Sequence, residues 1–401
     1  MPDQRMKVVA LGGCGGMGRY AVRTVLNFDF VDKLVIADQD GERARQFAQE
    51  CGPKASAAEV DVEDSAKLVA LLSEADVVLA TVGPYFRLGL PVLRAAIETG
   101  CDYFDINDDW ESTLDMLNLD EEARRAGVTA IIGMGASPGL SNMLAMKAMS
   151  LLDSVEDLIT GWGLAEGEVE SEQQRERPEP GERRTGGFSA AVEHWVHQCS
   201  GTIRVFRGGE FVDVAPIEEI KIDYPGIGLG TAHTVGHPEP ITLPRLRPEL
   251  RNSCNVMVMP PGIIEAMRQL TAEVDAGRMT VRQAAEALMN PSEEQRGSVA
   301  PGPSDEPRLP EFFAYASGLK NGQPARVGVT ISSGIAGGMG GMTGVPMATG
   351  LAVFARGQIT GKGVFAPEDV FDSDAFYDEI APLCTPKRAN AKEMLIINTS
   401  F

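Results

Sequence analysis

The most constraining feature of this chain is a glycine-rich turn between an apolar run and an amphipathic segment. Residues 8–11 form a short apolar run that is typical of a buried parallel strand, and the residues after Gly18 have the spacing of a helix with one apolar face. Between them, Gly13, Gly15 and Gly18 fit the spacing of a dinucleotide-binding turn. In such a turn the glycines permit the tight bend, the approach of a pyrophosphate and close helix packing.

An acidic residue follows at the distance that this turn requires. Residues 33–38 read as the next strand and end in Asp38, about 20 positions beyond the last glycine. A ribose diol needs a carboxylate acceptor at that place. The order of strand, turn, helix, strand and acid therefore predicts a nucleotide site, which we favour over a purely structural turn.

The charge and length of the chain exclude several classes of protein. Its 401 residues exceed the usual size of one core, so two domains are expected. A formal net charge of -21 disfavours nucleic acid or an anionic membrane as the main partner. No apolar run approaches the roughly 18 residues of a membrane span, and the start leaves no room for a signal peptide. We therefore expect a cytoplasmic protein, with six scattered cysteines in the reduced form.

Strands and helices alternate through the first part of the chain. Residues 41–51 and 65–72 have helical patterns, and residues 57–61 and 76–82 have strand patterns. This alternation predicts a parallel sheet with right-handed crossovers and a ligand crevice beyond the carboxyl ends of the strands. Pro84 and Tyr85 follow such an end, so we expect both to line the crevice.

Two further strand ends carry polar groups. A strand from residue 101 leads to Asp105, Asn107, Asp108 and Asp109, which could be hydrogen-bond partners for an amine, metal ligands or a solvated turn with a helix cap. Fixed ligand spacing is absent, so no metal is expected. After the strand at 128–132, small residues with Ser141 and Asn142 suit a loop and helix start near a ligand.

The middle of the chain has a different character. Residues 166–186 are polar, and we favour an exposed insertion over a substrate lid. Beyond them, strand-like pieces recur, and two alternating runs around Asn321 and Gly322 give a strong hairpin signal. This pattern predicts a mixed, largely antiparallel second domain with a helical excursion at 262–289. The glycine-rich run 334–344 is expected to be a flexible junction before a helix at about 343–356.

All four histidines fall in the second domain. His194 and His197 have zinc-compatible spacing, but no third ligand is visible, so we favour ordinary packing for both. His233 and His237 lie in a predicted glycine-rich loop and are the better candidates for proton transfer. Guanidinium groups bind carboxylates in bidentate fashion, and the candidates for one or two such contacts are Arg204, Arg245, Arg247 and Arg251.

Four motifs together resemble the saccharopine dehydrogenase (saccharopine reductase-like) family, at residues 12–18, 82–89, 101–105 and 135–142. That family includes NAD(P)-dependent lysine dehydrogenases and carboxynorspermidine synthases. The resemblance covers about residues 6–145 and the last sixty residues, where 343–348 and 361–364 also look similar. Between these regions, where substrate identity is decided, it is poor.

The resemblance implies a fold and a domain order. It implies an α/β chain with an N-terminal Rossmann domain, a doubly wound parallel sheet at residues 1–140, completed by a C-terminal segment at 343–401. An inserted mixed α/β domain at 141–342, which often dimerises in this family, would bind substrate in a cleft. We therefore expect a homodimer that acts on a small-molecule amine or amino acid.

The resemblance also implies site residues. Tyr85 and Asp105 would orient the amine, and His233 or His237 would carry the proton. The residues expected to bind the cofactor are Gly13, Gly15, Gly16, Met17, Gly18, Asp38, Val82, Gly83 and Pro84. The residues expected to bind substrate are Asn107, Ser137, Asn142, Arg204 and Arg245.

The family uses NAD or NADP, and Asp38 would repel a 2′-phosphate. NAD is therefore preferred, although Arg43 and Arg45 nearby leave NADP open. The expected reaction is hydride transfer at a carbon bearing nitrogen, as oxidative deamination or reductive condensation. Two alternatives stay open: an enoyl or carbonyl reductase on the same scaffold, and a non-catalytic nucleotide sensor.

Overall fold

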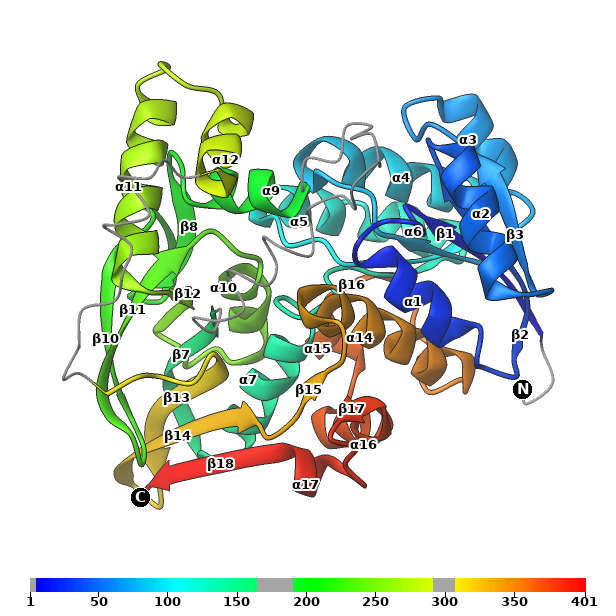
Figure 1. Ribbon diagram of the computed structural model, residues 1–401. Coiled ribbons are helices and arrows are strands. Elements are labelled where there is room, and N and C mark those ends of the chain that lie inside the picture. The colour runs from blue at the N-terminus through cyan, green and yellow to red at the C-terminus, as the bar shows by residue number, and fades with distance from the viewer. Residues whose placement is uncertain (1–4, 164–189, 291–306) are drawn as a thin grey trace. The chain divides into compact units, whose positions relative to one another are not determined.

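The structure is a computed structural model that describes residues 5–163, 190–290 and 307–401 (Figure 1). The polar segment 166–186, predicted to be an exposed insertion, lies outside the described residues. The chain divides into two compact units. Unit 1 comprises residues 1–146 and 331–396, and unit 2 comprises residues 147–330 and 397–401. The sequence places these divisions after residues 140 and 342.

Unit 1 is built on a seven-stranded sheet in the order β16-β6-β5-β4-β1-β2-β3. All neighbouring strands in it run parallel. The strands are β1 (Met6–Leu11), β2 (Val31–Asp38), β3 (Ala55–Glu59), β4 (Val77–Ala80), β5 (Asp102–Asp105), β6 (Thr129–Ile131) and β16 (Gly363–Phe365). The seventh strand comes from the C-terminal segment, which confirms the predicted fold class for this part of the chain.

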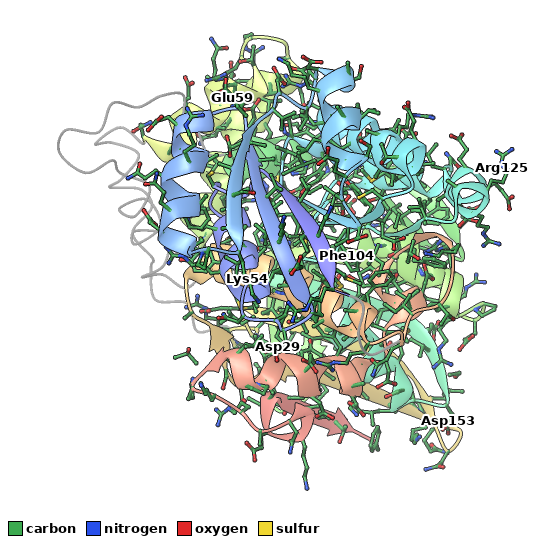
Figure 2. The ribbon with its side chains drawn as sticks, turned by 90° about the vertical axis from the view of Figure 1, so that its right-hand side faces the viewer. Asp29, Lys54, Glu59, Phe104, Arg125 and Asp153 are labelled. Atoms are coloured by element: carbon green, nitrogen blue, oxygen red, sulfur yellow. The ribbon has the colours of Figure 1, made fainter. Side chains whose placement is uncertain are left out.

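Burial explains the order of these strands. The last four residues of β1 and all four of β4 are buried, as expected for central strands covered on both faces. In contrast, β3 has no buried residue and forms one edge of the sheet. Lys54 immediately precedes this edge strand and Glu59 is its last residue (Figure 2).

The helices of unit 1 follow its strands in sequence. They are α1 (Gly18–Val25), α2 (Gly41–Cys51), α3 (Ser65–Leu72), α4 (Tyr85–Thr99), α5 (Trp110–Leu117), α6 (Asp120–Ala126) and the start of α7 (Leu140–Ser150). The C-terminal segment adds β15 (Gly334–Ile335), α14 (Gly338–Ala355), α15 (Pro367–Val370), α16 (Ser373–Ile380), η2 (Ala381–Leu383), β17 (Cys384–Thr385) and α17 (Ala391–Met394). Among the described residues, no helix has both the length and the apolar character to cross a bilayer.

The glycine-rich run 334–344 is not the flexible junction that we expected, because most of it is the first half of α14. This half packs against α1 and the turn before it. A Cβ on Gly340 would lie 2.7 Å from the carbonyl oxygen of Gly16, and one on Gly344 would lie 2.9 Å from the backbone nitrogen of Ala21. The glycines therefore serve close approach of two helices, and this packing overrides their low helix propensity.

Unit 2 holds a second, mixed sheet of nine strands. Its main path is β10-β11-β12-β7-β13-β14-β18, and β8 pairs with both β12 and β9. The strands are β7 (Ser154–Gly163), β8 (Ile203–Arg207), β9 (Glu210–Val214), β10 (Glu219–Tyr224), β11 (Gly228–Val235), β12 (Asn252–Val258), β13 (Phe312–Lys320), β14 (Gln323–Ile331) and β18 (Leu395–Ser400). The pair β12–β7 is parallel, whereas β13–β14 and β10–β11 are antiparallel. The predicted hairpin is confirmed, with Asn321 and Gly322 at φ of 52° and 74°.

The helices of unit 2 are α9 (Ala190–Gln198), α10 (Glu239–Thr242), η1 (Leu243–Leu246), α11 (Pro261–Asp275) and α12 (Val281–Met289). The helical excursion predicted at 262–289 is therefore two helices. The break between them contains Gly277, which has a φ of 68° that a helix cannot accommodate.

The sheet of unit 2 curls strongly. Tyr224 on β10 packs edge-on against Phe313, with ring centroids 5.6 Å apart, and also lies against Gly328 on β14. At the rim, the side-chain amide of Asn398 on β18 donates to the carbonyl oxygen of Pro225 at 2.9 Å. Strands at opposite ends of the sheet order therefore approach each other across the interior.

Candidate functional site

The strand order of unit 1 reverses between β1 and β4. The glycine-rich turn follows β1, and residues 82–84 follow β4. The two strands are paired in parallel, with Val8 opposite Val77. Parallel strands place both segments at the carboxyl edge of the sheet. Ligands of doubly wound sheets bind at such a reversal point, so this is where the fold places a nucleotide site.

Close packing explains the last glycine of the turn. A Cβ on Gly18 would overlap the carbonyl oxygen of Gly12 and lie 2.6 Å from the hydroxyl oxygen of Thr81. Thr81 donates its hydroxyl to the carbonyl oxygen of Leu11 at 2.9 Å and so joins the turn to β4. Gly12 itself has a φ of 69°, in the left-handed region. The third glycine of the pattern is therefore required for packing.

The other side of the turn is open. Among the residues that the structure describes, a Cβ on Gly16 would meet no atom within 4 Å. Met17, which precedes α1, makes no side-chain hydrogen bond to the first turn of that helix. The backbone N–H groups at a helix start carry partial positive charge and favour an anion. The turn thus has the shape and polarity that a pyrophosphate needs.

Asp38, at the end of β2, lies beside this turn. It is half-buried, and its carboxylate accepts the backbone N–H of Asp40 at 3.1 Å. Burial and the adjacent Asp38 carboxylate raise the pKa of the Cys14 thiol to about 12, while Arg43 and Arg19 act in the opposite direction. A carboxylate and two guanidinium groups therefore act electrostatically on a residue of this turn.

Tyr85 is placed differently from the prediction. It was expected to line a crevice after the strand end, but it is the first residue of helix α4. Its side chain is only 5% exposed, its hydroxyl donates to the carbonyl oxygen of Ala80 at 2.8 Å, and burial raises its pKa well above the usual value. In contrast, the three preceding residues, Val82, Gly83 and Pro84, stay partly exposed at the strand end.

Asp105 and Asn107 tie strand ends together within unit 1. The carboxylate of Asp105 is fully buried and accepts the N–H groups of Asn107 at 3.0 Å and Gly133 at 2.6 Å, and the hydroxyl of Tyr103 at 2.8 Å. Burial raises the pKa of Asp105 to about 6. Asn107 is also fully buried and donates to the hydroxyl of Thr113 at 3.1 Å. Both side chains are therefore occupied by contacts that hold the fold.

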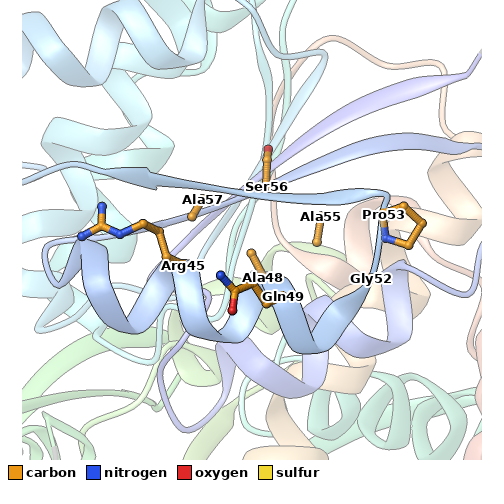
Figure 3. Close-up of a pocket in the computed structure, with 8 residues that line it drawn as sticks. All are labelled: Arg45, Ala48, Gln49, Gly52, Pro53, Ala55, Ser56 and Ala57. Atoms are coloured by element: carbon orange, nitrogen blue, oxygen red, sulfur yellow. The ribbon is translucent and has the colours of Figure 1, made fainter.

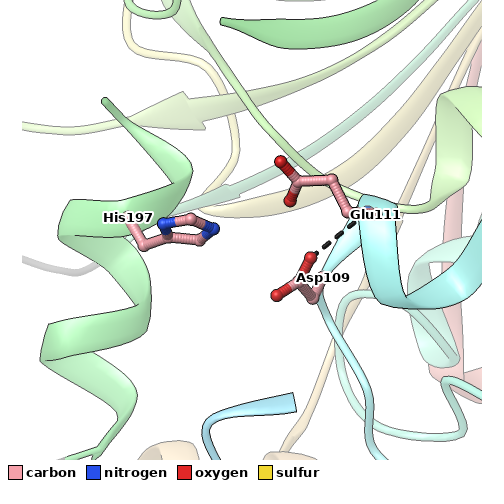
Figure 4. A group of neighbouring side chains, drawn as sticks. All are labelled: Asp109, Glu111 and His197. Atoms are coloured by element: carbon pink, nitrogen blue, oxygen red, sulfur yellow. Dashed lines mark hydrogen bonds between the residues drawn. The ribbon is translucent and has the colours of Figure 1, made fainter. Parts of the chain in front are cut away.

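Asp109 caps a helix, as one of the three alternatives expects, but its side chain is buried and not solvated. Its carboxylate accepts the backbone N–H of Glu111 at 3.2 Å and that of Ser112 at 3.4 Å, at the start of α5 (Figure 4). Of the polar cluster that follows β5, Asp108 alone stays partly exposed.

Asn142 joins the two sequence segments of unit 1. Its side-chain oxygen accepts the N–H of Gly139 at 2.8 Å, and its nitrogen donates to Glu368 at 2.7 Å. Glu368 lies on α15, 226 residues further along the chain. It was missed in the sequence because nothing in its neighbourhood marks it. Ser137, in the loop before α7, is half-buried.

In unit 2, His237 belongs to a buried polar network. Its Nδ1 lies 3.3 Å from Oε2 of Glu239, whose Oε1 accepts from Nδ2 of Asn255 at 2.9 Å. Asn255 accepts from the indole N–H of Trp162 at 3.0 Å and donates to the hydroxyl of Thr160 at 2.9 Å. His237 is 3% exposed, and Glu239 and Asn255 are fully buried. An imidazole oriented by a carboxylate is a typical proton-transfer arrangement.

The remaining predicted residues of unit 2 have other surroundings. His233 lies on strand β11, not in a loop, and burial lowers its pKa. The guanidinium of Arg204 donates to both oxygens of Asp213, at 2.7 and 2.9 Å, across the β8–β9 hairpin. Arg245 donates to the carbonyl oxygen of Thr242 at 3.2 Å. Trp162 and Asn255 were missed because single polar residues within strands carry no spacing signal.

A surface depression lies elsewhere in unit 1. Residues of α2, of the connection after it and of the edge strand β3 line it (Figure 3): Arg45, Ala48, Gln49, Gly52, Pro53, Ala55, Ser56 and Ala57. Ala55 and Ala57 point toward α2, and Ser56 points the opposite way, as alternation along a strand requires. The connection from Gly52 to Pro53 enters β3 at its amino end, whereas nucleotides bind beyond the carboxyl ends. We therefore do not assign the cofactor to this depression.

Comparison with known proteins agrees with the motifs. Residues 8–131 match the family described as the saccharopine dehydrogenase NADP binding domain. Apo saccharopine dehydrogenase (L-Glu forming) from Saccharomyces cerevisiae matches 99% of this chain and 100% of its own, with a TM-score of 0.65 and 16% identity. The family match confirms the resemblance over the first strands, and the structural match shows the shared fold.

Curated relatives match only in part. A trans-acting enoyl reductase from Mycobacterium leprae is 27% identical over 164 residues, which are 39% of this chain and 39% of that protein. A lipid droplet localized protein from Caenorhabditis elegans is 30% identical over 142 residues, or 33% of each chain. The matched part thus spans less than half the length of these relatives.

Proposed function

Because residues 8–131 of this chain match the saccharopine dehydrogenase NADP binding domain, we propose that it is an NAD(P)-dependent oxidoreductase that transfers hydride at a carbon bearing nitrogen. The substrate would be an amino acid or a secondary amine, undergoing oxidative deamination or, in reverse, reductive condensation. The observation that carries the proposal is the glycine turn at the strand-order reversal, with Asp38 beside it.

The residues of unit 1 fit a dinucleotide. Backbone N–H groups after Gly15 would hold the pyrophosphate, and the Asp38 carboxylate would accept from the adenosine ribose. We propose NAD as the preferred cofactor, since Asp38 opposes a 2′-phosphate. The family's description names NADP, and Arg19 and Arg43 near Asp38 favour a phosphate at the same place.

Proton transfer falls to the second unit in this proposal. A nicotinamide cofactor, when bound, would supply the hydride acceptor, and oxidation of an amine would also release one proton from nitrogen. We propose that the imidazole of His237 accepts this proton. Tyr85 and Asp105 are engaged by contacts within unit 1, so we do not assign them to the amine.

Nicotinamide absorbance at about 340 nm tests the reaction class. Purified protein with NAD or NADP is offered lysine, saccharopine, diamines and other amino acids. The proposal predicts reduction with at least one amine, and at least a tenfold loss of rate in His237→Gln. An unchanged rate in that variant would remove His237 from the mechanism, and silence with every amine would remove the C–N assignment.

A second candidate is an enoyl reductase, because the M. leprae relative carries that description. This reaction predicts oxidation of the reduced cofactor by an α,β-unsaturated acyl thioester, with no amine present. The same assay run in the opposite direction separates the two candidates.

We also propose that the chain forms a homodimer. Light scattering at several protein concentrations tests this, and a monomer mass at all of them would exclude it.

A further inference from the structure

We infer that two copies of this chain associate through strand β18, which pairs in antiparallel fashion with β18 of the second copy. The inference rests on the homodimer proposed above and assigns the surface that forms it. It depends on the place of β18 in the sheet of unit 2, on the side chains of that strand and on the charge of the chain.

β18 is the last strand on the main path of the nine-stranded sheet. Among the residues that the structure describes, its neighbour in this sheet is β14 on one side, and no strand lies on the other (Figure 1). Its side chains at positions 396, 397, 399 and 400 are exposed. A strand at a sheet edge presents backbone N–H and C=O groups with which another strand can pair. The edge of β18 is therefore a template for one more strand.

The other sheet edges carry charged side chains, which natural proteins use to prevent such pairing. These residues are Glu219, Lys221 and Asp223 on β10, Glu210 and Asp213 on β9, and Glu59 on β3. In contrast, residues 395–401 include no charged side chain and no proline. Among the described edge strands of more than three residues, β18 alone lacks this protection.

The charge of the chain favours an uncharged edge as the contact between two copies. Each copy has a formal net charge of -21, so two copies repel each other, and like charges placed opposite one another in a sheet are destabilising. Two β18 strands can pair without bringing charged side chains together. The pairing also uses the same edge in both copies, so the assembly closes at two chains and does not grow into a fibre.

Apolar side chains are concentrated on this strand. Ile396 is 44% exposed, Ile397 is 41% exposed and Phe401, directly after the strand, is 65% exposed. Single exposed apolar residues are common on protein surfaces, whereas a group of them marks an interaction site. Pairing with a second strand would remove part of this apolar surface from water.

The pleat of β18 separates its side chains into two faces. The side-chain nitrogen of Asn398 donates to the carbonyl oxygen of Pro225, and Ser400 lines a depression with Gly226. These two side chains therefore point toward the β10–β11 hairpin. Because successive side chains of a strand alternate, Ile397, Thr399 and Phe401 share the opposite face.

This alternation selects a register. A two-fold axis perpendicular to the sheet places each residue opposite one on the same face. With the axis at Thr399, Ile397 lies opposite Phe401 of the partner subunit, and Thr399 lies opposite Thr399 of the partner subunit. Pairs of aromatic with β-branched residues and of threonine with threonine stabilise sheets. An axis at Asn398 would leave Phe401 without a cross-strand partner, so we place the axis at Thr399.

Crosslinking through one introduced cysteine tests this register in the full chain. In Thr399→Cys the two new residues lie at the axis, where opposite Cα atoms are about 5 Å apart, so mild oxidation should link most of the protein as dimers. Ile397→Cys is the matched control, because it lies on the same face and is also exposed. Its two copies would be about 13 Å apart, beyond the reach of a disulfide. The wild type, with its six cysteines, gives the background.

A charge placed at the axis tests the interface independently. Thr399→Lys sets two ammonium groups opposite each other, and the dissociation constant of the dimer should rise about 100-fold. Sedimentation at several protein concentrations measures it. Phe211→Lys is the control, because it adds the same charge at an exposed residue of the edge strand β9 and should leave the dimer unchanged. Neither position belongs to the proposed nucleotide site, so nucleotide affinity should be the same in both variants.

The outcomes separate the interface from the homodimer itself. A dimer that is equally tight in Thr399→Lys would overturn the inference and leave the homodimer standing. Equal crosslinking of Ile397→Cys and Thr399→Cys would overturn the register and with it the inference. A wild type that is monomeric at every concentration would overturn both the inference and the homodimer, whereas nucleotide binding and turnover would still test the proposed reaction.

Discussion

The two units of this molecule build their polar sites in opposite ways. In unit 1, the residues of the glycine turn are neighbours in sequence, and Asp38 is one strand away. In unit 2, Trp162, His237 with Glu239, and Asn255 come from three separate segments and meet only in the folded sheet. A local site depends mainly on backbone shape, whereas a dispersed site depends on every strand holding its register.

Because of this difference, we expect the largest effect from Asn255→Leu. It removes the centre of the buried network and leaves the Trp162 N–H and the Glu239 carboxylate with fewer partners. The free energy of unfolding should fall by about 4 kcal/mol, measured by chemical denaturation. Asn252→Leu on the same strand is the control, since that site is partly exposed and should cost about 1 kcal/mol. Equal losses in the two variants would mean that the buried network adds no more stability than one partly exposed hydrogen-bonded side chain.

Gly18→Val breaks the local site instead. Its side chain would overlap Gly12 and crowd Thr81, so the unfolding free energy should fall by about 3 kcal/mol. Nucleotide affinity should fall at least 100-fold, because the turn can no longer close. Gly16→Ala, whose Cβ meets no atom within 4 Å, should keep full stability. Normal nucleotide binding by Gly18→Val would show that the turn is not the site.

The buried carboxylate of Asp105 in unit 1 should make the free energy of unfolding depend on pH. Its pKa is raised from 3.8 to about 6, so the folded state holds the proton more tightly than the unfolded state. This contribution to stability is present below about pH 4 and is lost as pH rises through about 6, by about 3 kcal/mol in total.

Asp105→Asn should remove that pH-dependent loss. The difference in unfolding free energy between variant and wild type should therefore rise with pH over this window. Asp115→Asn, at an exposed position, should show no such trend. Nucleotide binding should survive in Asp105→Asn, since the carboxylate of Asp105 is engaged by Tyr103, Asn107 and Gly133. A flat difference between the pH profiles would contradict the raised pKa.

Asp38→Ala should have the smallest effect. Loss of one hydrogen bond to a charged acceptor should weaken NAD binding about tenfold. NADP binding should improve, because the repulsion disappears and Arg19 and Arg43 remain. Calorimetric titration with each nucleotide measures the ratio, and Glu42→Gln, on the exposed first turn of α2, is the control. If the ratio of NAD affinity to NADP affinity does not change, residues other than Asp38 determine the cofactor specificity.

Sequence reasoning succeeded where the determining contacts are local. The strand, turn and acid from Val8 to Asp38 were predicted because each step has its own pattern. The hairpin at Asn321 was predicted because two residues with positive φ suffice to define it. The parallel sheet followed from alternation of strands and helices in the first part of the chain, and its completion by the C-terminal segment followed from the family resemblance.

Sequence reasoning failed where tertiary packing determines the local structure or the partners of a side chain. Tyr85, expected to line a crevice, is instead buried at the start of α4, and the glycines of α14 are helical only because α1 lies against them. The partners of Asp105 and Arg204 are residues of the same chain that no spacing rule connects to them. Asn255 gave no signal, because its partners lie 16 and 95 residues away.

The central claim is that unit 1 binds a nicotinamide dinucleotide at the turn after β1. Calorimetric titration of NAD and of NADP into the wild-type chain and into Gly18→Val tests this claim most directly. The account predicts one binding site in the wild type, tighter for NAD, and no measurable heat in the folded variant. Absence of heat with both nucleotides in the folded wild type would contradict it.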